Sequence, residues 1–230
     1  MKIAIIADIH ANLEAFEAVL ADSKRNECTH YAFLGDFVGY CADPKACVDI
    51  VRSMNAPCVQ GNHDEYCSTD LPLEGFNPAA AKAVEWTRNQ LTEDDRQWLR
   101  NLPYTRTVED FTLVHATLDA PQRWGYVFDK LAAAANFTQQ HTQLCFFGHT
   151  HVPVAFVEDS RVVRGGTYVS FKIEKGKRYF VNVGAVGQPR DNNRKAAYVI
   201  YDKDKGLIEL RRVDYDIEAT RRKIRNSGLR

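Results

Sequence analysis

Short apolar runs alternate along this chain with longer amphipathic stretches. Residues 2–7 form the first apolar run, and residues 11–24 follow with Leu13, Phe16 and Leu20 at helical spacing. Further apolar runs predict buried strands at residues 31–34, 57–60, 111–114, 144–147, 179–183 and 197–201. Helices are predicted at residues 44–54, 76–102 and 127–141 and in the charged C-terminal segment. Such alternation favours an α/β fold over an all-α or an all-β one.

Length and composition are those of an ordinary globular protein. The 230 residues, 45% hydrophobic and 26% charged, are enough to bury the core of one domain. We expect residues 1–230 to form a single domain with a helical insertion at about residues 66–110, because that segment carries few chemistry-bearing side chains.

Charge and cysteine content exclude several classes of protein. The 30 Lys and Arg residues balance the 30 Asp and Glu residues, so we expect no nucleic acid polymer as a partner. The apolar run near the start is too short to span a bilayer and lacks a signal peptide's cleavage region, so we expect a cytoplasmic protein without a membrane partner. The six cysteines form no C-x-x-C pair, which argues against a zinc ribbon.

Polar side chains that can bind metals follow five of the apolar runs, at the point where each run ends. These side chains are Asp8, His10, Asp36, Asn62, His63, Asp64, His115, His149 and His151. Five of the seven histidines lie in these turns, and Gly precedes the polar residue in three of the turns. Because ligands bind beyond the carboxyl ends of strands in α/β sheets, we expect these side chains to meet in space.

This set of side chains predicts a centre with two metal ions. It is richer in oxygen ligands than a structural zinc site and suits Mn, Fe, Zn or similar divalent ions. A single ion does not need so many protein ligands while it keeps a position open for water, whereas two ions about 3.5–4 Å apart share a bridging carboxylate. His149 and His151 would then each serve a different ion.

The same residues resemble a known family. Asp8-x-His10, Gly35-Asp36, the run from Gly61 to Asp64, His115 and the run from Gly148 to His151 are similar, in order, to the five motif blocks of the calcineurin-like metallophosphoesterase superfamily. Residues 35–44 and 182–190 resemble small prokaryotic phosphoesterases related to diadenosine tetraphosphatases. The resemblance implies a four-layer α-β-β-α sandwich with two mixed sheets.

The resemblance also implies a role for each site residue. The implied ligands of one metal are Asp8, His10 and His151, those of the other are Asn62, His115 and His149, and Asp36 bridges both. His63 is similar to the family's catalytic acid. The implied reaction is direct attack of a metal-bound hydroxide on phosphorus while His63 protonates the leaving oxygen.

Two positions differ from the protein Ser/Thr phosphatase branch of the family. That branch has an acid and an Arg where this chain has Gly39 and Tyr40. The acid that would orient His63 is therefore absent from its place, and Asp64 is the candidate substitute. The missing Arg argues against phosphoproteins as substrates.

Further side chains are candidates for binding substrate. Arg190 and Arg123 are candidate phosphate ligands, although Arg190 could instead be a turn residue paired with Asp191. Trp124 and Tyr126 could cover a base or serve only the structure.

These observations favour a dinuclear metal-dependent phosphoesterase that hydrolyses small phosphate monoesters, nucleotides in particular. A first alternative is a hydrolase of dinucleoside polyphosphates or phosphodiesters. A second alternative is a non-catalytic metal-binding interaction scaffold, against which the intact set of seven ligands and His63 argues.

Overall fold

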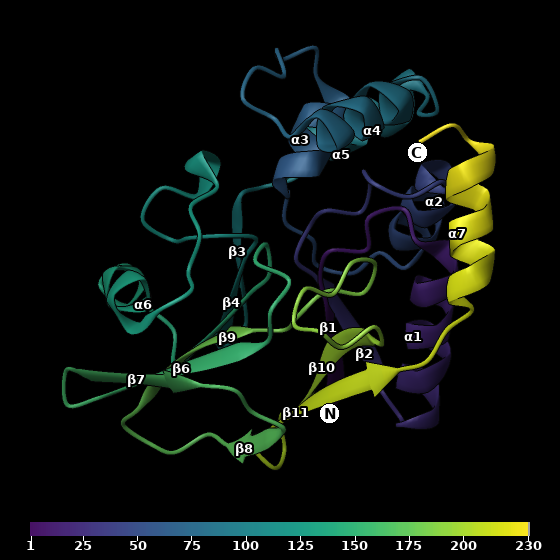
Figure 1. Ribbon diagram of the computed structural model, residues 1–230. Helices are drawn as coiled ribbons and strands as arrows, with labels where there is room; N and C mark the ends of the chain where they lie inside the picture. The colour runs from purple at the N-terminus through teal and green to yellow at the C-terminus, as the bar shows by residue number, and fades with distance from the viewer. Residues whose placement is uncertain (230) are drawn as a thin grey trace.

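Two β-sheets with helices outside both make up the computed structural model, which describes residues 1–229 (Figure 1). The first sheet has the strand order β2-β1-β10-β11-β8. Its strands are β1 (Lys2–Ile6), β2 (His30–Phe33), β8 (Ser170–Lys172), β10 (Ala196–Asp202) and β11 (Leu207–Val213). β1 pairs in parallel with β2 and antiparallel with β10, so this sheet is mixed.

The second sheet is also mixed and has the strand order β3-β4-β5-β9-β6-β7. Its strands are β3 (Thr105–Val108), β4 (Phe111–Val114), β5 (Leu144–Phe147), β6 (Val154–Asp159), β7 (Val162–Gly166) and β9 (Arg178–Asn182). β4, β5 and β9 run parallel to one another, and β3, β6 and β7 are antiparallel to their neighbours.

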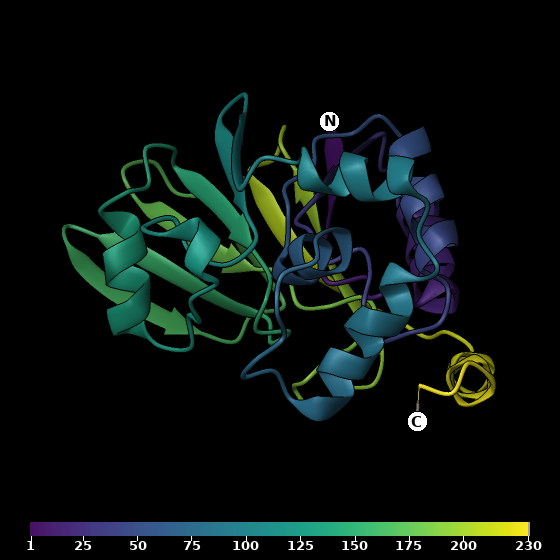
Figure 2. The same cartoon turned by 90° about the horizontal axis from the view of Figure 1, so that it is seen from above.

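Helices cover the outer faces of the sheets. α1 (Leu13–Arg25) and α2 (Pro44–Ser53) lie beside the first sheet, α7 (Ile217–Asn226) packs on α1, and α6 (Lys130–Phe137) lies beside the second sheet. α1 begins where the Asn12 side chain accepts a hydrogen bond from the Ala15 N–H. In Figure 2, α7 is seen end-on at the edge of the molecule. No helix within residues 1–229 is both long and apolar enough to cross a membrane.

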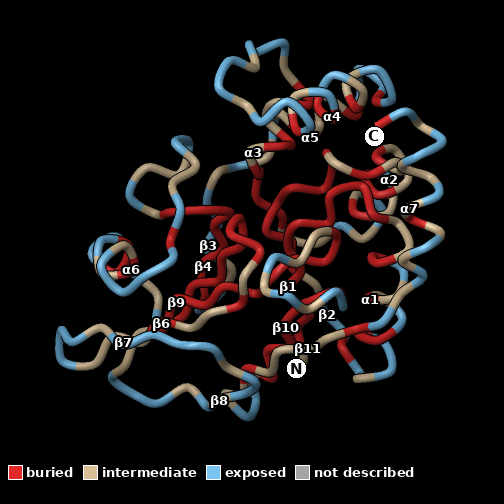
Figure 3. The backbone as a smooth tube through the Cα atoms, in the orientation of Figure 1, coloured by how far each residue is buried: buried red, intermediate tan, exposed pale blue. Residues whose placement is uncertain are grey.

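Three clusters of apolar side chains fill the spaces between the layers. Ala4 and Ile6 of β1 pack towards the helices with Phe16, whereas Ile3 and Ile5 pack between the two sheets with Val199 and Phe146. This alternation buries β1 on both faces, as expected for a central strand. A third cluster, with Phe137 and Phe180, joins the second sheet to α6. Figure 3 shows the buried backbone concentrated at the centre of the molecule, in the central strands and the loops that follow them. The predicted four-layer α-β-β-α sandwich with two mixed sheets is confirmed.

Three predicted elements differ from those observed. Residues 57–60 are not a strand: they touch β2 only at one bridge, between Phe33 and Cys58, because the next N–H that would continue the ladder, that of Gly61, donates to the Asp64 carboxylate instead. The helix predicted at residues 76–102 is two helices, α4 (Pro78–Arg88) and α5 (Glu93–Arg100), and α6 is shorter than predicted.

A further helix, α3 (Asn62–Ser68), begins directly after Gly61. α4 and α5 both pack on α3, and Figure 1 shows the three helices together at one end of the molecule. The candidate ligand Asn62 therefore stands at the first turn of a helix and not at the end of a strand.

Candidate metal centre

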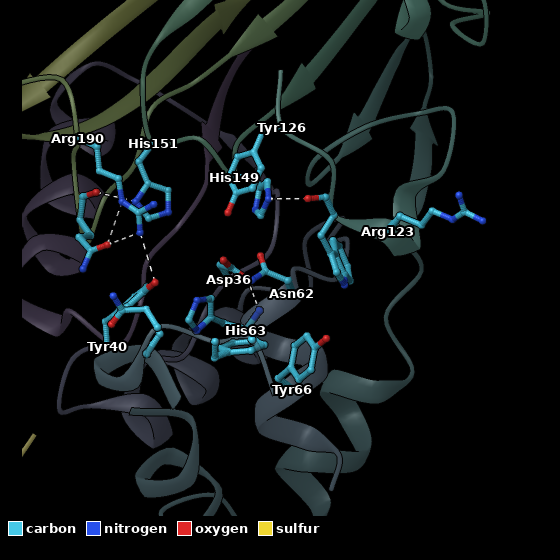
Figure 4. A pocket seen from close by; sticks show the side chains of 16 residues that line it. Asp36, Tyr40, Asn62, His63, Tyr66, Arg123, Tyr126, His149, His151 and Arg190 are labelled. Atoms are coloured by element: carbon cyan, nitrogen blue, oxygen red, sulfur yellow. Dashed lines mark hydrogen bonds between the residues drawn. The ribbon is translucent and has the colours of Figure 1, made fainter. Parts of the chain in front are cut away.

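Six of the seven predicted ligands follow the carboxyl ends of strands from both sheets. β1 precedes Asp8 and His10, β2 precedes Asp36, β4 precedes His115, and β5 precedes His149 and His151. Asn62 joins them from α3 (Figure 4). All seven side chains are brought together, from two facing sheets and a helix.

Two groups of side chains could each hold a metal ion. One group contains Asp8, His10, Asp36 and His151, and the other contains Asp36, His115 and His149. Asp36 belongs to both: its Oδ2 lies 3.5 Å from Nε2 of His10 and 3.4 Å from Nε2 of His115. Such separations fit ligands that share one ion, because atoms about 2.1 Å from an ion lie about 3–3.5 Å from one another. A single carboxylate oxygen thus faces both groups.

Each histidine of the cluster is oriented by a backbone carbonyl. The hydrogen bonds join Nδ1 of His10 to Val38 O (3.1 Å), Nδ1 of His115 to Leu34 O (2.7 Å), Nε2 of His149 to Trp124 O (3.0 Å) and Nδ1 of His151 to Gln188 O (2.7 Å). A carbonyl only accepts, so the ring nitrogen beside it carries the hydrogen. The other nitrogen of each neutral ring therefore presents a lone pair to the cluster, as metal-binding histidines do.

The ring nitrogens that carry no hydrogen face one another or an amide oxygen, so that lone pairs point at lone pairs. Nε2 of His10 lies 3.1 Å from Nε2 of His151, and Nε2 of His115 lies 3.2 Å from Nδ1 of His149 and 3.1 Å from Oδ1 of Asn62. Oδ1 of Asp8 is buried without a hydrogen-bond partner. Converging lone pairs and an orphaned carboxylate oxygen are stabilised by cations, so these residues fit a pair of metal ions.

The electrostatics of the cluster also favour cations. Burial lowers the pKa of His115, but the charge on Asp36 and a hydrogen bond to it outweigh burial and raise that pKa to about 9. Burial and the charge on His115 lower the pKa of His149 to about 3. Without a metal ion, these charges favour a second proton on Nε2 of His115, and an ion that binds there displaces this proton and leaves the neutral ring with its lone pair.

The backbone at the cluster is strained. Five of the seven candidate ligands have left-handed φ angles: Asp8 (55°), His10 (49°), Asp36 (53°), His149 (66°) and His151 (60°). Residues other than glycine rarely adopt this region, and each costs on the order of 1–2 kcal/mol. The packing of the surrounding residues holds the backbone in this strained form. Such strain is typical of functional sites.

His63 lies beside the cluster and lines a cavity that opens over it. Its ring is 4.5 Å from that of Tyr40 and 4.9 Å from that of His10, measured between centroids. Gly39, at φ 89°, makes room for it, since a Cβ there would lie 2.4 Å from His63 Nδ1. That nitrogen is buried without a hydrogen-bond partner.

The prediction that Asp64 orients His63 is wrong. The Asp64 carboxylate accepts hydrogen bonds from the backbone N–H groups of Asp36 (2.7 Å), Phe37 (2.8 Å) and Gly61 (3.0 Å). These bonds use its oxygens to fix the loop that carries Asp36. Asp64 is adjacent to His63 in sequence, but the first turn of α3 directs the two side chains to different neighbours.

A cavity of about 680 Å³ opens over the cluster. Arg190 lines it, and Oε1 of Gln188 (2.7 Å) and the Tyr40 hydroxyl (3.4 Å) accept hydrogen bonds from the guanidinium. Asp191 pairs with Arg212, so the alternative that Arg190 is only a partner of Asp191 is not observed. Arg123 reaches the cavity margin, but Figure 4 shows its guanidinium pointing away from the histidines.

Sequence reasoning missed several residues of the cavity wall. Tyr66 and Phe76 line the cavity together with Trp124. The rings of Tyr66 and Phe76 lie edge to face, with their centroids 4.6 Å apart. Tyr66 lies on α3, which was not predicted, and Phe76 lies in the loop before α4. No spacing in the sequence relates either residue to the metal motifs.

Comparisons with known proteins agree with this arrangement. The calcineurin-like phosphoesterase superfamily domain matches residues 1–206. The uncharacterized protein MJ0912 of Methanocaldococcus jannaschii is 36% identical over 99% of this chain and 93% of its own length. A metallophosphoesterase from Sphaerobacter thermophilus is 40% identical, with a TM-score of 0.89 over 100% of this chain and 95% of that one. The hypothetical protein PH1004 from Pyrococcus horikoshii OT3 has a TM-score of 0.80 at 16% identity, over 100% of this chain and 94% of that one, and so shares the fold.

The motif order, the two groups of ligands that share Asp36 and the match over most of the chain agree with one another. This chain belongs to the calcineurin-like phosphoesterase superfamily and is a metal-dependent phosphoesterase.

Proposed function

We propose that this chain hydrolyses small phosphate monoesters, nucleotides in particular, at a centre of two divalent metal ions. The observation that carries the proposal is the position of the Asp36 carboxylate, whose Oδ2 is shared by two groups of oriented histidines. Asp8, His10 and His151 would hold one ion, and Asn62, His115 and His149 the other. When bound, two such ions polarise the phosphate oxygens and make water a nucleophile at neutral pH.

His63 is the proposed acid for the leaving oxygen. Its Nδ1 faces Gly39, which leaves Nε2 for the cavity that the ring lines. Burial lowers the pKa of His63 in the free protein, whereas a phosphate dianion in the cavity would favour the charged ring. A proton on Nε2 can then pass to the departing oxygen as its bond to phosphorus breaks.

Arg190 is the side chain that we propose binds the phosphate group of the substrate. Gln188 and Tyr40 hold its guanidinium at the cavity wall, and its backbone N–H donates to the His151 carbonyl at 3.2 Å. A guanidinium fixed in this way can stabilise charge on phosphate oxygens during transfer. Arg123, at the margin, would at most meet a second anionic group of a longer substrate.

The cavity suits a substrate of nucleotide size. Its volume of about 680 Å³ lies in the range of pockets for small molecules. Tyr66, Phe76 and Trp124 are among the residues that line the cavity, and aromatic rings can stack on a base. We therefore expect the phosphate at the metal cluster and the base against these rings.

A panel of substrates tests the proposal at one metal concentration. It compares kcat/KM for p-nitrophenyl phosphate, its bis-ester, nucleoside monophosphates, diadenosine tetraphosphate and a phosphoserine peptide. We expect monoesters and nucleotides to exceed the phosphopeptide and the bis-ester. If kcat/KM for diadenosine tetraphosphate exceeds that for nucleoside monophosphates by more than about a hundredfold, roughly 2.7 kcal/mol of transition-state binding, the substrates are dinucleoside polyphosphates and not nucleotides.

A further inference from the structure

Glu65 lies three residues after the candidate ligand Asn62 and makes two contacts that the metal cluster itself does not explain. Its Oε2 accepts a hydrogen bond from the Trp124 indole N–H at 2.9 Å, and its Oε1 accepts one from the Tyr104 hydroxyl at 2.9 Å. These donors lie 59 and 39 residues away in sequence. No ion pair to Glu65 is found within residues 1–229, so two neutral donors hold this half-buried carboxylate.

Trp124 connects Glu65 to the cluster. Its backbone has a left-handed φ of 54°, which a bulky residue adopts only when its surroundings hold it there. In this conformation the Trp124 carbonyl accepts the hydrogen bond from Nε2 of His149 at 3.0 Å. The rings of Tyr104 and His115 contact the indole edge to face, at 5.6 Å and 5.7 Å between centroids.

The hydrogen bond from His149 to Trp124 decides which nitrogen of His149 faces the cluster. His149 presents Nδ1 to His115, whereas His10, His115 and His151 present Nε2. If the Trp124 carbonyl moved, the His149 ring would lose the bond that fixes its tautomer and its rotation. Of the four carbonyls that orient the cluster, this one belongs to a residue whose side chain is itself anchored from α3.

We propose that Glu65 is a positioning residue for the second metal site, acting through Trp124 on His149. Because Asn62 and Glu65 both lie on α3, the bond from Trp124 to Glu65 links the two sides of that site, Asn62 and His149. The inference rests on the proposed assignment of Asn62, His115 and His149 to one ion. Among residues 1–229, the side chains of Asp8, His10 and His151 form no hydrogen bond with Glu65 or Trp124, so this link does not orient the ligands of the other ion.

The test measures metal binding rather than turnover. Apo-protein is titrated with Mn²⁺ by calorimetry, and bound metal is counted after dialysis. Glu65→Ala and Trp124→Phe should weaken one of the two ions by about 10- to 100-fold and leave the other unchanged, as expected when a ligand loses its supporting bond. Asn62→Ala provides the reference for loss of that ion, and His10→Ala for loss of the other.

Two variants control for general damage. Tyr104→Phe removes the other donor to Glu65 and should shift neither affinity by more than about threefold, since it leaves the link to Trp124 intact. Glu65→Gln should keep both ions, because its amide oxygen can accept from the indole while its NH₂ group donates to the tyrosine hydroxyl. Circular dichroism and Tm report whether each variant is folded.

Two results would overturn the inference. One is wild-type affinity for both ions in Glu65→Ala and Trp124→Phe. The other is an equal loss of both ions in these variants, which would indicate a general structural role. Failure of the wild-type protein to bind two ions would instead refute the proposed function, so the two failures are distinguishable.

Discussion

Asp36 is the residue on which both proposed metal sites depend. Its replacement by Asn keeps the size of the side chain but removes the charge shared by the two groups. We expect Asp36→Asn to weaken each ion by at least about tenfold, equivalent to about 1.4 kcal/mol. Calorimetric titration with Mn²⁺ measures the effect, and Asp70→Asn, at an exposed carboxylate paired with Arg96, is the control. Loss of only one ion would show that Asp36 does not bridge.

His63 should affect chemistry and not metal content. His63→Ala is expected to lower kcat by roughly 10²–10⁴ for a substrate with a poor leaving group, because the proton donor is gone. p-Nitrophenyl phosphate, whose leaving group needs little protonation, should lose less. Elemental analysis should find the wild-type metal content in this variant, and an empty site would mean that the ring is a ligand.

Gly39 should be required for the position of His63. In Gly39→Ala the new Cβ would lie 2.4 Å from His63 Nδ1, so the ring must move. We expect a loss of kcat with retained metal content. Gly176→Ala is the matched control, since Gly176 has a similar φ of 85° but no atom within 4 Å of the added carbon. Equal behaviour of the two variants would attribute the effect to backbone strain alone.

Metal binding should depend on pH through His115. Because the pKa of His115 is raised to about 9, the metal-free cluster holds a proton below that pH, and an incoming ion must displace it. The apparent affinity for the ion should therefore rise by about tenfold per pH unit up to about pH 9 and then level off. Titrations between pH 6 and 10 measure this, and a flat profile would contradict the assignment of the proton to His115.

At the scale of elements, the strands were predicted best where apolar residues run without interruption. β1 and β5 could be predicted because both of their faces are buried. α3 could not, because Asn62, His63 and Asp64 read as the polar end of a strand, whereas the Asp64 carboxylate accepts a hydrogen bond from the Gly61 N–H at 3.0 Å and so caps the start of a helix. The single domain with a helical insertion at about residues 66–110 stays a prediction.

Two hydrogen bonds to one carboxylate join α1 to two strands of the first sheet. The Tyr198 hydroxyl on β10 donates to Oδ2 of Asp22 on α1 at 2.8 Å, and Arg211 on β11 donates to the same oxygen at 3.2 Å. Tyr198→Phe should lower the free energy of unfolding by about 1–2 kcal/mol, since the buried carboxylate loses a donor. Urea unfolding at pH 7 measures this loss, and an unchanged midpoint would contradict it.

The same hydrogen bonds predict how the loss varies with pH. Burial raises the pKa of Asp22, but hydrogen bonds from Arg211 and Tyr198 outweigh burial and lower it. A lowered carboxyl pKa stabilises the fold above the unfolded value of about 3.9, and this stability disappears as pH falls through the folded pKa. The difference between wild type and Tyr198→Phe should therefore shrink in acid.

At the scale of the whole molecule, the gathering of the candidate ligands in one place could be predicted because six of the seven follow an apolar strand, and Asn62 follows an apolar run. The order of the motifs carried this information within the sequence. Trp124 was a candidate for the cavity, but Tyr66 and Phe76 could not be predicted, because they join its lining only when α3, the loop before α4 and the loop after β4 come together. Asp64 was misjudged for a related reason: sequence adjacency gives no side-chain direction.

The central claim is that two ions per chain make this protein a phosphomonoesterase. The most direct measurement adds Mn²⁺ stepwise to chelated protein and follows bound metal and hydrolysis of a nucleoside monophosphate in the same samples. We expect negligible turnover without metal and full turnover only as binding approaches two ions per chain. Full turnover by the chelated protein, or a plateau at one ion per chain, would contradict it.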